Sequence, residues 1–145
     1  MKKLFIIFFL ISACGYQPLY LEKNKIQFKK ITLLGDKKIN RKIVSSVQIK
    51  EDENILTNNE IILESKIDII TTSKDSKGQP TTFKSLLNVN LTIKENDKNI
   101  KVKTFNESFD YNNIINKYDL SVYQNDVRNN LIDKIVEDIT IFINL

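Results

Sequence analysis

The most regular alternation of apolar and polar side chains in this chain runs through Phe83-Lys84-Ser85-Leu86-Leu87-Asn88-Val89-Asn90-Leu91-Thr92-Ile93-Lys94. Apolar residues occupy nearly every second position, and lysine, asparagine and threonine lie mainly between them. A period of two is typical of a β-strand that is buried on one side only. The stretch therefore predicts a central strand whose apolar face meets a core.

Two further strands are predicted beside this one. Residues 61–69 again alternate with a period of two. Residues 73–82 contain Lys-Gly-Gln-Pro, which predicts a turn between the two strands, and the polar residues 95–99 predict a second hairpin turn. Residues 100–111 predict a fourth strand, whose apolar positions change phase near Thr104. These segments together predict an antiparallel meander.

The region before residue 61 predicts one more strand and a helix. Residues 26–34 alternate, with a phase slip near Lys30 that predicts a β-bulge. Gly35-Asp36 ends this strand, and Asp36 is a suitable N-cap for a helix over residues 37–50. Helical spacing is followed there by the apolar residues Ile39, Ile43, Val44 and Val47. Polar residues at 51–59 predict a loop.

The end of the chain predicts a long amphipathic helix after an asparagine-rich linker at residues 111–119. Its apolar stripe consists of Val127, Leu131, Ile135, Ile139 and Phe142, widened by Ile132, Val136 and Ile143. Acidic residues dominate the opposite side, which favours packing on the sheet over a coiled coil or a membrane-surface helix. We expect Leu131, Ile135 and Ile139 to be buried.

The predicted order of elements is strand, helix, three strands, helix (β-α-β-β-β-α). Two helices can cover one face of a four-stranded sheet, so the sequence predicts an α+β two-layer sandwich with a mostly antiparallel sheet. The uncovered face should carry Lys66, Lys84 and Lys94, together with Lys101 and Lys103. We interpret these five lysines as candidate contacts for an anionic ligand or a protein partner. The alternative is that they only keep the domain soluble.

The first 14 residues resemble the signal of a bacterial lipoprotein. Met1-Lys2-Lys3 is a positive start, and the next eight residues, 4–11, are apolar. This run is too short to span a bilayer as a helix, for which about 20 residues are needed. Ile11-Ser12-Ala13-Cys14 resembles a lipobox, although isoleucine stands where leucine is more usual. The alternative is an ordinary signal peptide with an incidental cysteine.

What the lipobox resemblance implies is a lipid anchor on Cys14, the only cysteine in the chain. Cleavage before Cys14 and acylation of its thiol and its new amine would attach three acyl chains. More than one chain is needed for stable anchoring to a membrane. Gly15 stands where a signal for retention in the inner membrane usually has aspartate. The implied location is the periplasmic side of the outer membrane.

The residues after Cys14 resemble one lipoprotein family. The string Cys14-Gly15-Tyr16-Gln17-Pro18-Leu19-Tyr20 is similar to the mature N-terminus of the LptE family of lipopolysaccharide-assembly lipoproteins, especially its alphaproteobacterial branch. The predicted order of elements is similar to the α/β sandwich of that family along the rest of the chain. The resemblance implies a signal peptide at residues 1–13, a lipidated tether at 14–24 and one LptE-like domain at 25–145.

The family resemblance also implies partners. LptE-type lipoproteins bind the outer-membrane β-barrel LptD, occupy its lumen as a plug and assist the insertion of lipopolysaccharide. This chain would then partner an LptD-type barrel and lipopolysaccharide. A second hypothesis is an outer-membrane lipoprotein that serves barrel assembly or envelope architecture without binding lipopolysaccharide. A third is an accessory or solute-binding module in the periplasm.

Composition excludes several classes of function. The chain has no histidine, which removes Ser-His and Cys-His catalysis and most zinc sites. Its three glycines are scattered, so it has no phosphate-binding loop, and the acidic run 51–53 lacks the pattern of a calcium-binding loop. Twenty of the 22 basic residues are lysine, whereas proteins that bind nucleic acid favour arginine. We therefore expect no enzyme, no metal or other cofactor and no nucleic-acid partner.

Overall fold

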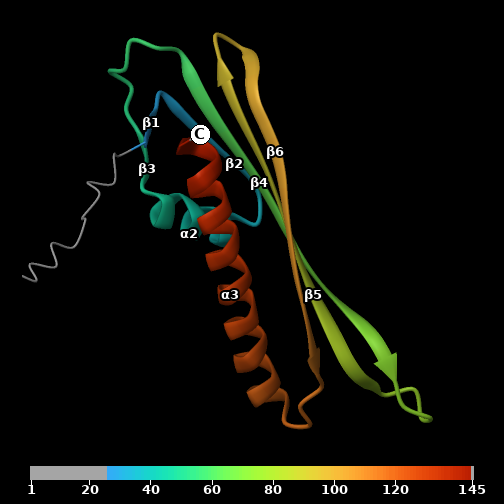
Figure 1. The fold of residues 1–145 in the computed structure, drawn as a ribbon. Helices are drawn as coiled ribbons and strands as arrows, with labels where there is room; N and C mark the ends of the chain where they lie inside the picture. Colours follow the sequence, from blue (N-terminus) through green and yellow to red (C-terminus); the bar gives the residue numbers. More distant parts are fainter. Residues whose placement is uncertain (1–25, 145) are drawn as a thin grey trace, which may run out of the picture.

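A four-stranded sheet forms one layer of the molecule in the computed structural model, which describes residues 26–144 (Figure 1). Its strand order is β2-β4-β5-β6, where β2 spans Lys30–Gly35, β4 Asn59–Lys74, β5 Pro80–Glu95 and β6 Lys98–Asn112. The last three strands form an antiparallel meander, and β2 pairs with β4 in parallel. The predicted meander is therefore confirmed, with β2 as its only parallel partner in the described chain.

Two helices form the second layer, on one face of the sheet (Figure 1). They are α2, Lys37–Val47, and α3, Lys117–Asn144. Both helices pack on the sheet to form one core. Its fully buried side chains come from the helices (Ile39, Ile43, Leu131, Ile135 and Ile139) and from strands β4 and β5 (Ile61, Leu63, Leu87, Val89 and Leu91). This arrangement confirms the predicted α+β two-layer sandwich and the predicted burial of Leu131, Ile135 and Ile139.

A small second sheet corrects the prediction for the first strand. Residues 26–34 do not form one bulged strand, because the chain bends at Lys29 between β1, Ile26–Phe28, and β2. β1 pairs in parallel with β3, Ile49–Glu51, outside the main sheet. The phase slip near Lys30 therefore marks the point where the chain leaves one sheet and enters the other.

Helix α2 is shorter than predicted. It ends at Val47 rather than residue 50, because Gln48 adopts the left-handed conformation with φ 62°. The Gln48 N–H turns back to the carbonyl oxygens of Val44 and Ser45, which closes the last turn. The chain can then extend, so Ile49 is buried as part of a strand and not of a helix.

The connection from β2 to α2 is fixed by close backbone contacts with β4. Asp36 caps the helix as predicted, since its Oδ1 accepts hydrogen bonds from the N–H groups of Lys38 and Ile39 at 2.9 and 3.1 Å. The Asp36 N–H donates to the Ser65 carbonyl oxygen at 2.9 Å, and Ser65 Oγ donates to the Asp36 carbonyl oxygen at 3.1 Å. Gly35 has φ +74°, and a Cβ atom there would lie 2.1 Å from the Ser65 carbonyl oxygen. Only glycine fits this position without displacing the backbone.

The fourth strand is more regular than predicted. Its register with β5 runs without interruption from Lys101 to Asn112, so no phase change occurs near Thr104. The irregularity lies earlier in the strand. Ile93 pairs with Lys101 and Lys94 pairs with Asn99, so Ile100 of β6 has no partner on β5. The apolar side chain of Val102 consequently lies on the uncovered face and is 61% exposed.

The two hairpin turns and the final linker are shorter than predicted. Asp75 organises the first turn, because its Oδ1 accepts hydrogen bonds from the N–H groups of Lys77 and Gln79, both at 2.8 Å. The turn between β5 and β6 contains only Asn96 and Asp97, both at positive φ, as in a type I′ turn. Asn116 caps α3, because its Oδ1 accepts a hydrogen bond from the Tyr118 N–H at 2.9 Å. The linker after β6 therefore ends at Asn116, whereas the prediction placed its end at Asp119.

Helix α3 extends along the length of the sheet. Its 28 residues correspond to about 42 Å at the usual rise of an α-helix. Within residues 26–144, neither helix combines the length and the apolar content that crossing a membrane requires.

Candidate functional site

Three of the five predicted lysines lie on the face of the sheet that the helices leave uncovered. In the register of β4 with β5, Lys66 is opposite Asn88, whereas the buried Leu63 is opposite Leu91. Directly opposed residues share a face, and successive residues alternate between faces. The same alternation puts Lys84 and Lys94 on the side of Lys66, which confirms their predicted placement.

Lys101 and Lys103 lie on the other side, so their predicted placement with those three lysines is wrong. They are opposite Ile93 and Leu91, whose side chains enter the core. The Lys103 Nζ lies 4.8 Å from the ring centroid of Phe105 and 5.2 Å from that of Phe142 in α3. Lys101 Nζ is 5.6 Å from the Phe142 centroid. The prediction failed because it placed the phase change of β6 four residues too late along the strand.

Ion pairs neutralise the uncovered face. Lys66 Nζ is 2.8 Å from Asp68 Oδ2, and Lys84 Nζ is 3.3 Å from Asp110 Oδ2. At the start of the sheet a third pair joins Lys30 Nζ to Glu60 Oε1 at 3.2 Å. With Lys94 and Glu64, the regularly paired part of this face, up to Thr71 of β4, carries four lysines and four carboxylates. It therefore offers no excess of positive charge to an anion.

Neutral polar side chains connect the strands between these ion pairs. Asn90 Nδ2 donates to Glu64 Oε2 at 3.4 Å, and Thr104 Oγ1 donates to Asn90 Oδ1 at 2.8 Å. Glu64, Asn90 and Thr104 are direct neighbours on β4, β5 and β6, so the chain of hydrogen bonds crosses three strands. Such cross-strand pairs stabilise a sheet while leaving further donors and acceptors for a partner.

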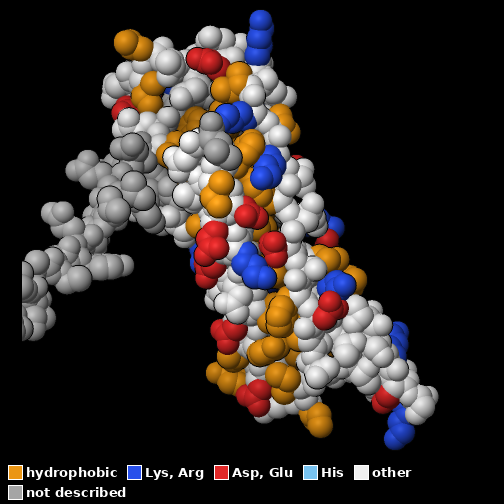
Figure 2. Space-filling view, in the orientation of Figure 1, with side chains coloured by type: hydrophobic (Ala, Val, Ile, Leu, Met, Phe, Trp, Pro, Cys, Tyr) orange, Lys and Arg blue, Asp and Glu red, His pale blue; other side chains and the backbone are white. Residues whose placement is uncertain are grey.

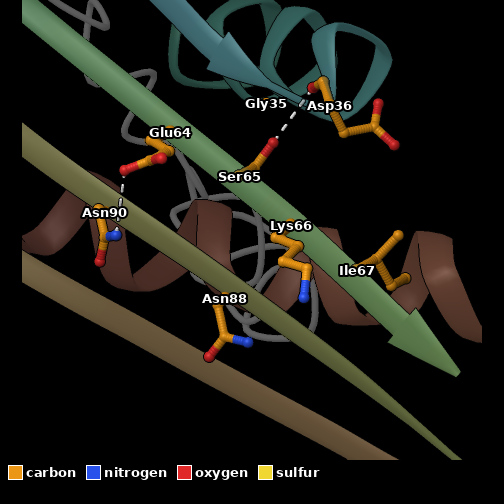
Figure 3. Close-up of a pocket in the computed structure, with 8 residues that line it drawn as sticks. All are labelled: Gly35, Asp36, Glu64, Ser65, Lys66, Ile67, Asn88 and Asn90. Atoms are coloured by element: carbon orange, nitrogen blue, oxygen red, sulfur yellow. Dashed lines mark hydrogen bonds between the residues drawn. The ribbon is translucent and has the colours of Figure 1, made fainter. Parts of the chain in front are cut away.

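A shallow depression of ≈ 470 Å³ lies where β2 ends and β4 continues with β5 as its only neighbouring strand in the described chain (Figure 3). It is lined by Gly35, Asp36, Glu64, Ser65, Lys66, Ile67, Asn88 and Asn90. Figure 3 shows the side chains of Lys66 and Asn88 extending to the same side from neighbouring strands. The combination of two amides, one ammonium group and two carboxylates suits polar contacts of either charge.

Among the carboxylates of residues 26–144, Glu60 is the one whose pKa is clearly shifted. The Thr32 hydroxyl donates to Glu60 Oε1 at 2.6 Å, which lowers the pKa of Glu60. Partial burial opposes this effect, and the positive charges of Lys30 and Lys94 lower the pKa further. The carboxylate is therefore held in its charged form, as a partner for the two lysines.

Metal binding and lipid attachment would each need particular side chains. Within residues 26–144, no group of three histidine, cysteine, aspartate or glutamate side chains could hold a metal ion. Cys14, the predicted lipid attachment, lies outside the described residues.

The ion pairs between the lysines of the uncovered face and carboxylates were not predicted from the sequence. Asp68 follows Lys66 by two positions, so the alternation alone puts both on one face, and this signal was available. Asp110 meets Lys84 only because β6 pairs with β5 in one particular register, which the sequence did not reveal. The same register explains why the bond between Asn90 and Thr104 was not predicted.

Comparison with known proteins identifies the fold. No protein-family model and no curated protein matches the sequence. Among solved structures, rare lipoprotein B from Shewanella oneidensis is 13% identical, with a TM-score of 0.52, over 76% of this chain and 92% of that one. The described domain shares the fold of this solved lipoprotein.

Two more solved structures agree. A minor lipoprotein from Acinetobacter baumannii is 14% identical over 79% of this chain and 90% of that one, with a TM-score of 0.55. A lipoprotein B from Nitrosomonas europaea is 10% identical over 79% of this chain and 81% of that one, with a TM-score of 0.57. At such identities the shared property is the fold, and the shared fold includes most of the domain.

Proposed function

We propose that this protein is an outer-membrane lipoprotein, anchored through Cys14 on the periplasmic side, with a binding role and not a catalytic one. The observation that carries the proposal is the stretch Cys14–Tyr20 directly ahead of a domain with a bacterial lipoprotein fold. A domain held at the membrane by its N-terminus needs only a short link. Eleven residues, 15–25, separate Cys14 from β1.

We further propose that its partner is an LptD-type β-barrel, which it plugs while assisting the insertion of lipopolysaccharide. The resemblance of Cys14–Tyr20 to the LptE family supports this role. The uncovered face supports it also. Because Lys66 and Lys84 are paired with carboxylates and Asn90 is hydrogen-bonded within the sheet, these groups could meet the polar wall of a barrel lumen without leaving an unpaired buried charge. Lys66, Lys84 and Lys94 would then contact the wall or the phosphates of lipopolysaccharide.

One observation favours a second candidate. Because the lysines of the uncovered face are balanced by carboxylates, this face is weakly suited to a polyanion such as lipopolysaccharide. An outer-membrane lipoprotein that serves barrel assembly or envelope architecture, without binding lipopolysaccharide, would use the same face for protein contacts alone.

The deciding experiment is an affinity purification of the full-length protein from solubilised outer membranes. Recovery of a large barrel of the lipopolysaccharide-transport class would support the first candidate, and recovery of the barrel-assembly core would support the second. The control is Cys14→Ser, which should lose labelling by a palmitate analogue and should be released from the membrane fraction. A wild-type protein that is cleaved but unlabelled would contradict the lipid anchor.

A further inference from the structure

The outer edge of β6 is open along its whole length, since no described strand pairs with it. The direction of its free backbone groups follows from one contact: the Asn113 N–H donates to the Thr81 carbonyl oxygen at 2.8 Å, next to the pair Thr82 and Asn112. In an antiparallel pair, residues bonded to the neighbour alternate with residues bonded outward. The outward groups from residue 102 onward therefore belong to Val102, Thr104, Asn106, Ser108, Asp110 and Asn112.

The part of this edge from Thr104 onward lacks most of the usual protection against pairing. Natural proteins protect long edge strands with proline, lysine or a bulge in the exposed stretch. The lysines of β6 and its bulge at Ile100 all lie before Thr104, and residues 104–112 contain no proline, lysine or bulge. The opposite edge strand, β2, is only six residues long. Of the two, the β6 edge is the one suited to accept a strand.

A groove of ≈ 380 Å³ lies beside this edge, between β6 and α3. Its apolar lining includes Phe109, Tyr123, Val127 and Leu131. Phe109 and Tyr123 are 44% and 38% exposed, and Figure 2 shows apolar side chains along the lower part of this face. A strand added to β6 would point every second side chain into this groove.

The charge of the groove selects its occupant. Three carboxylates and one lysine line it, and that lysine, Lys134, is 3.7 Å from Glu107 on β6. Asp133 is 3.2 Å from Lys42 of α2, whereas Asp126 and Glu137 form no ion pair with any described residue. Both side chains are exposed at the rim of the groove. The occupant should therefore carry basic side chains.

A second copy of this chain fits poorly. If two β6 edges paired about a two-fold axis, the two α3 helices would lie on the same side of the combined sheet. The groove carboxylates of both copies, Asp126, Asp133 and Glu137, would then face the same side. Like charges brought together in this way are unfavourable. The occupant that matches both the edge and the groove is a different chain.

We propose that β6 and the adjoining groove bind an extended segment of another protein, which adds a strand to the sheet and places alternating basic and apolar side chains against α3. Main-chain hydrogen bonds to the outward groups of β6 would supply affinity, and the groove would supply specificity. This site lies on the helix side and edge of the sheet, so it does not depend on the role proposed for the uncovered face.

The test uses full-length protein in detergent and a synthetic peptide of about ten residues. Every second residue of the peptide is threonine, and the positions between them alternate lysine and valine. In a control peptide, glutamate replaces each lysine. The lysine peptide should bind and slow amide hydrogen exchange at Thr104, Asn106 and Ser108, whose N–H groups point outward. The double variant Asp126→Asn, Glu137→Gln should weaken binding at least about tenfold at low salt.

Two further variants make the result specific. Asp119→Asn with Asp138→Asn removes two exposed carboxylates of α3 that do not line the groove, and should leave the affinity nearly unchanged. Ser108→Pro removes one outward N–H and leaves the bonds to β5, so it should weaken binding of the peptide. Equal binding of both peptides, binding of neither, or equal effects of the two double variants would overturn the proposal. So would a dimer in sedimentation that Ser108→Pro dissociates, because it would show a second copy at the edge.

Discussion

Adjacent residues of β5 have opposite surroundings on the two faces of the sheet. Leu87, Val89 and Leu91 are fully buried under the helices, whereas Asn88 and Asn90, between them, are exposed on the other side. The helix side depends on close packing of apolar side chains, where the loss of a few methyl groups leaves a cavity. The uncovered side depends on ion pairs and amide contacts, each of which is weak alone in water. Stability should therefore respond strongly to changes on one face and weakly to changes on the other.

The largest effect is expected on the helix side, from Ile135→Ala. Ile135 has no exposed surface, so its truncation should lower the free energy of unfolding by about 2–5 kcal/mol. Chemical denaturation measures this change. The matched control is Asp138→Ala, an exposed position of the same helix, which should change stability by no more than about 0.5 kcal/mol. Equal denaturation midpoints for the two variants would remove the proposed difference between the faces.

The next effect is expected where β2 joins α2, from Gly35→Ala. A Cβ atom there meets the Ser65 backbone and the residue also has φ +74°, so the loss should exceed about 1–2 kcal/mol. Gly78→Ala is a close control, because Gly78 has φ +78° but nothing within 4 Å of its Cβ position. Thermal unfolding of both variants separates the close contact from the backbone conformation. If Gly35→Ala lost no more stability than Gly78→Ala, β4 would have to be able to move away from the new Cβ atom at residue 35.

A smaller effect, with a definite pH dependence, is expected on the uncovered side from Thr32→Val. The Thr32 hydroxyl lowers the pKa of Glu60, so it stabilises the folded protein when Glu60 is charged. This contribution is present above the ordinary pKa of 4.5 and is lost as the pH falls through the lowered value. The variant should be less stable than the wild type at pH 7, by less than about 1.5 kcal/mol. The difference should disappear at strongly acidic pH.

Denaturation at a series of pH values tests this expectation. Thr92→Val is the control, since Thr92 lies on the same face opposite Ile62 and Val102. A stability difference for Thr32→Val that persists unchanged in acid would show that the hydroxyl acts through packing and not through the charge of Glu60.

The smallest effect on stability is expected from the triple change of Lys66, Lys84 and Lys94 to serine. Exposed ion pairs contribute little, so the free energy of unfolding should change by less than about 1 kcal/mol. Barrel co-purification and lipopolysaccharide binding should both decrease, more at low salt than at moderate salt. The control changes three exposed lysines elsewhere, Lys38, Lys50 and Lys117, to serine. Should both triple variants retain full binding, the uncovered face serves only solubility.

The sequence predicted the layers better than the register. Residues 83–94 have one apolar face as a strand, and α3 has one apolar stripe as a helix. Each apolar surface is removed from water by packing on the other, so the sequence alone predicts that the helix lies on the sheet. The capping role of Asp36 was equally local. The small β1–β3 sheet was not predicted, since strands of three residues carry too little periodicity to reveal themselves.

The candidate site was predicted in part for the same reason. Lys66, Lys84 and Lys94 share a face through alternation within single strands, which the sequence shows directly. Lys101 and Lys103 depended on where the bulge falls in β6, and a shift of one residue moves a side chain to the other face. The ion pair between Lys84 and Asp110 depends on pairing between strands, which a single sequence does not contain.

The position of α3 after all the described strands has a consequence for how the protein folds. The helix contributes Val127, Leu131, Ile132, Ile135 and Ile139 to the one core, so part of the apolar face of the sheet stays uncovered until the chain has been made as far as residue 139. The β4–β6 meander forms from neighbouring segments, but β2 must wait for β4, which pairs with it 30 residues later. Until then the apolar side of the nascent sheet is exposed, and a chaperone that binds apolar segments would hold the chain during that interval. Loss of the last two turns of α3 should therefore reduce the yield of folded protein more than it reduces the affinity of the surviving protein for its partner.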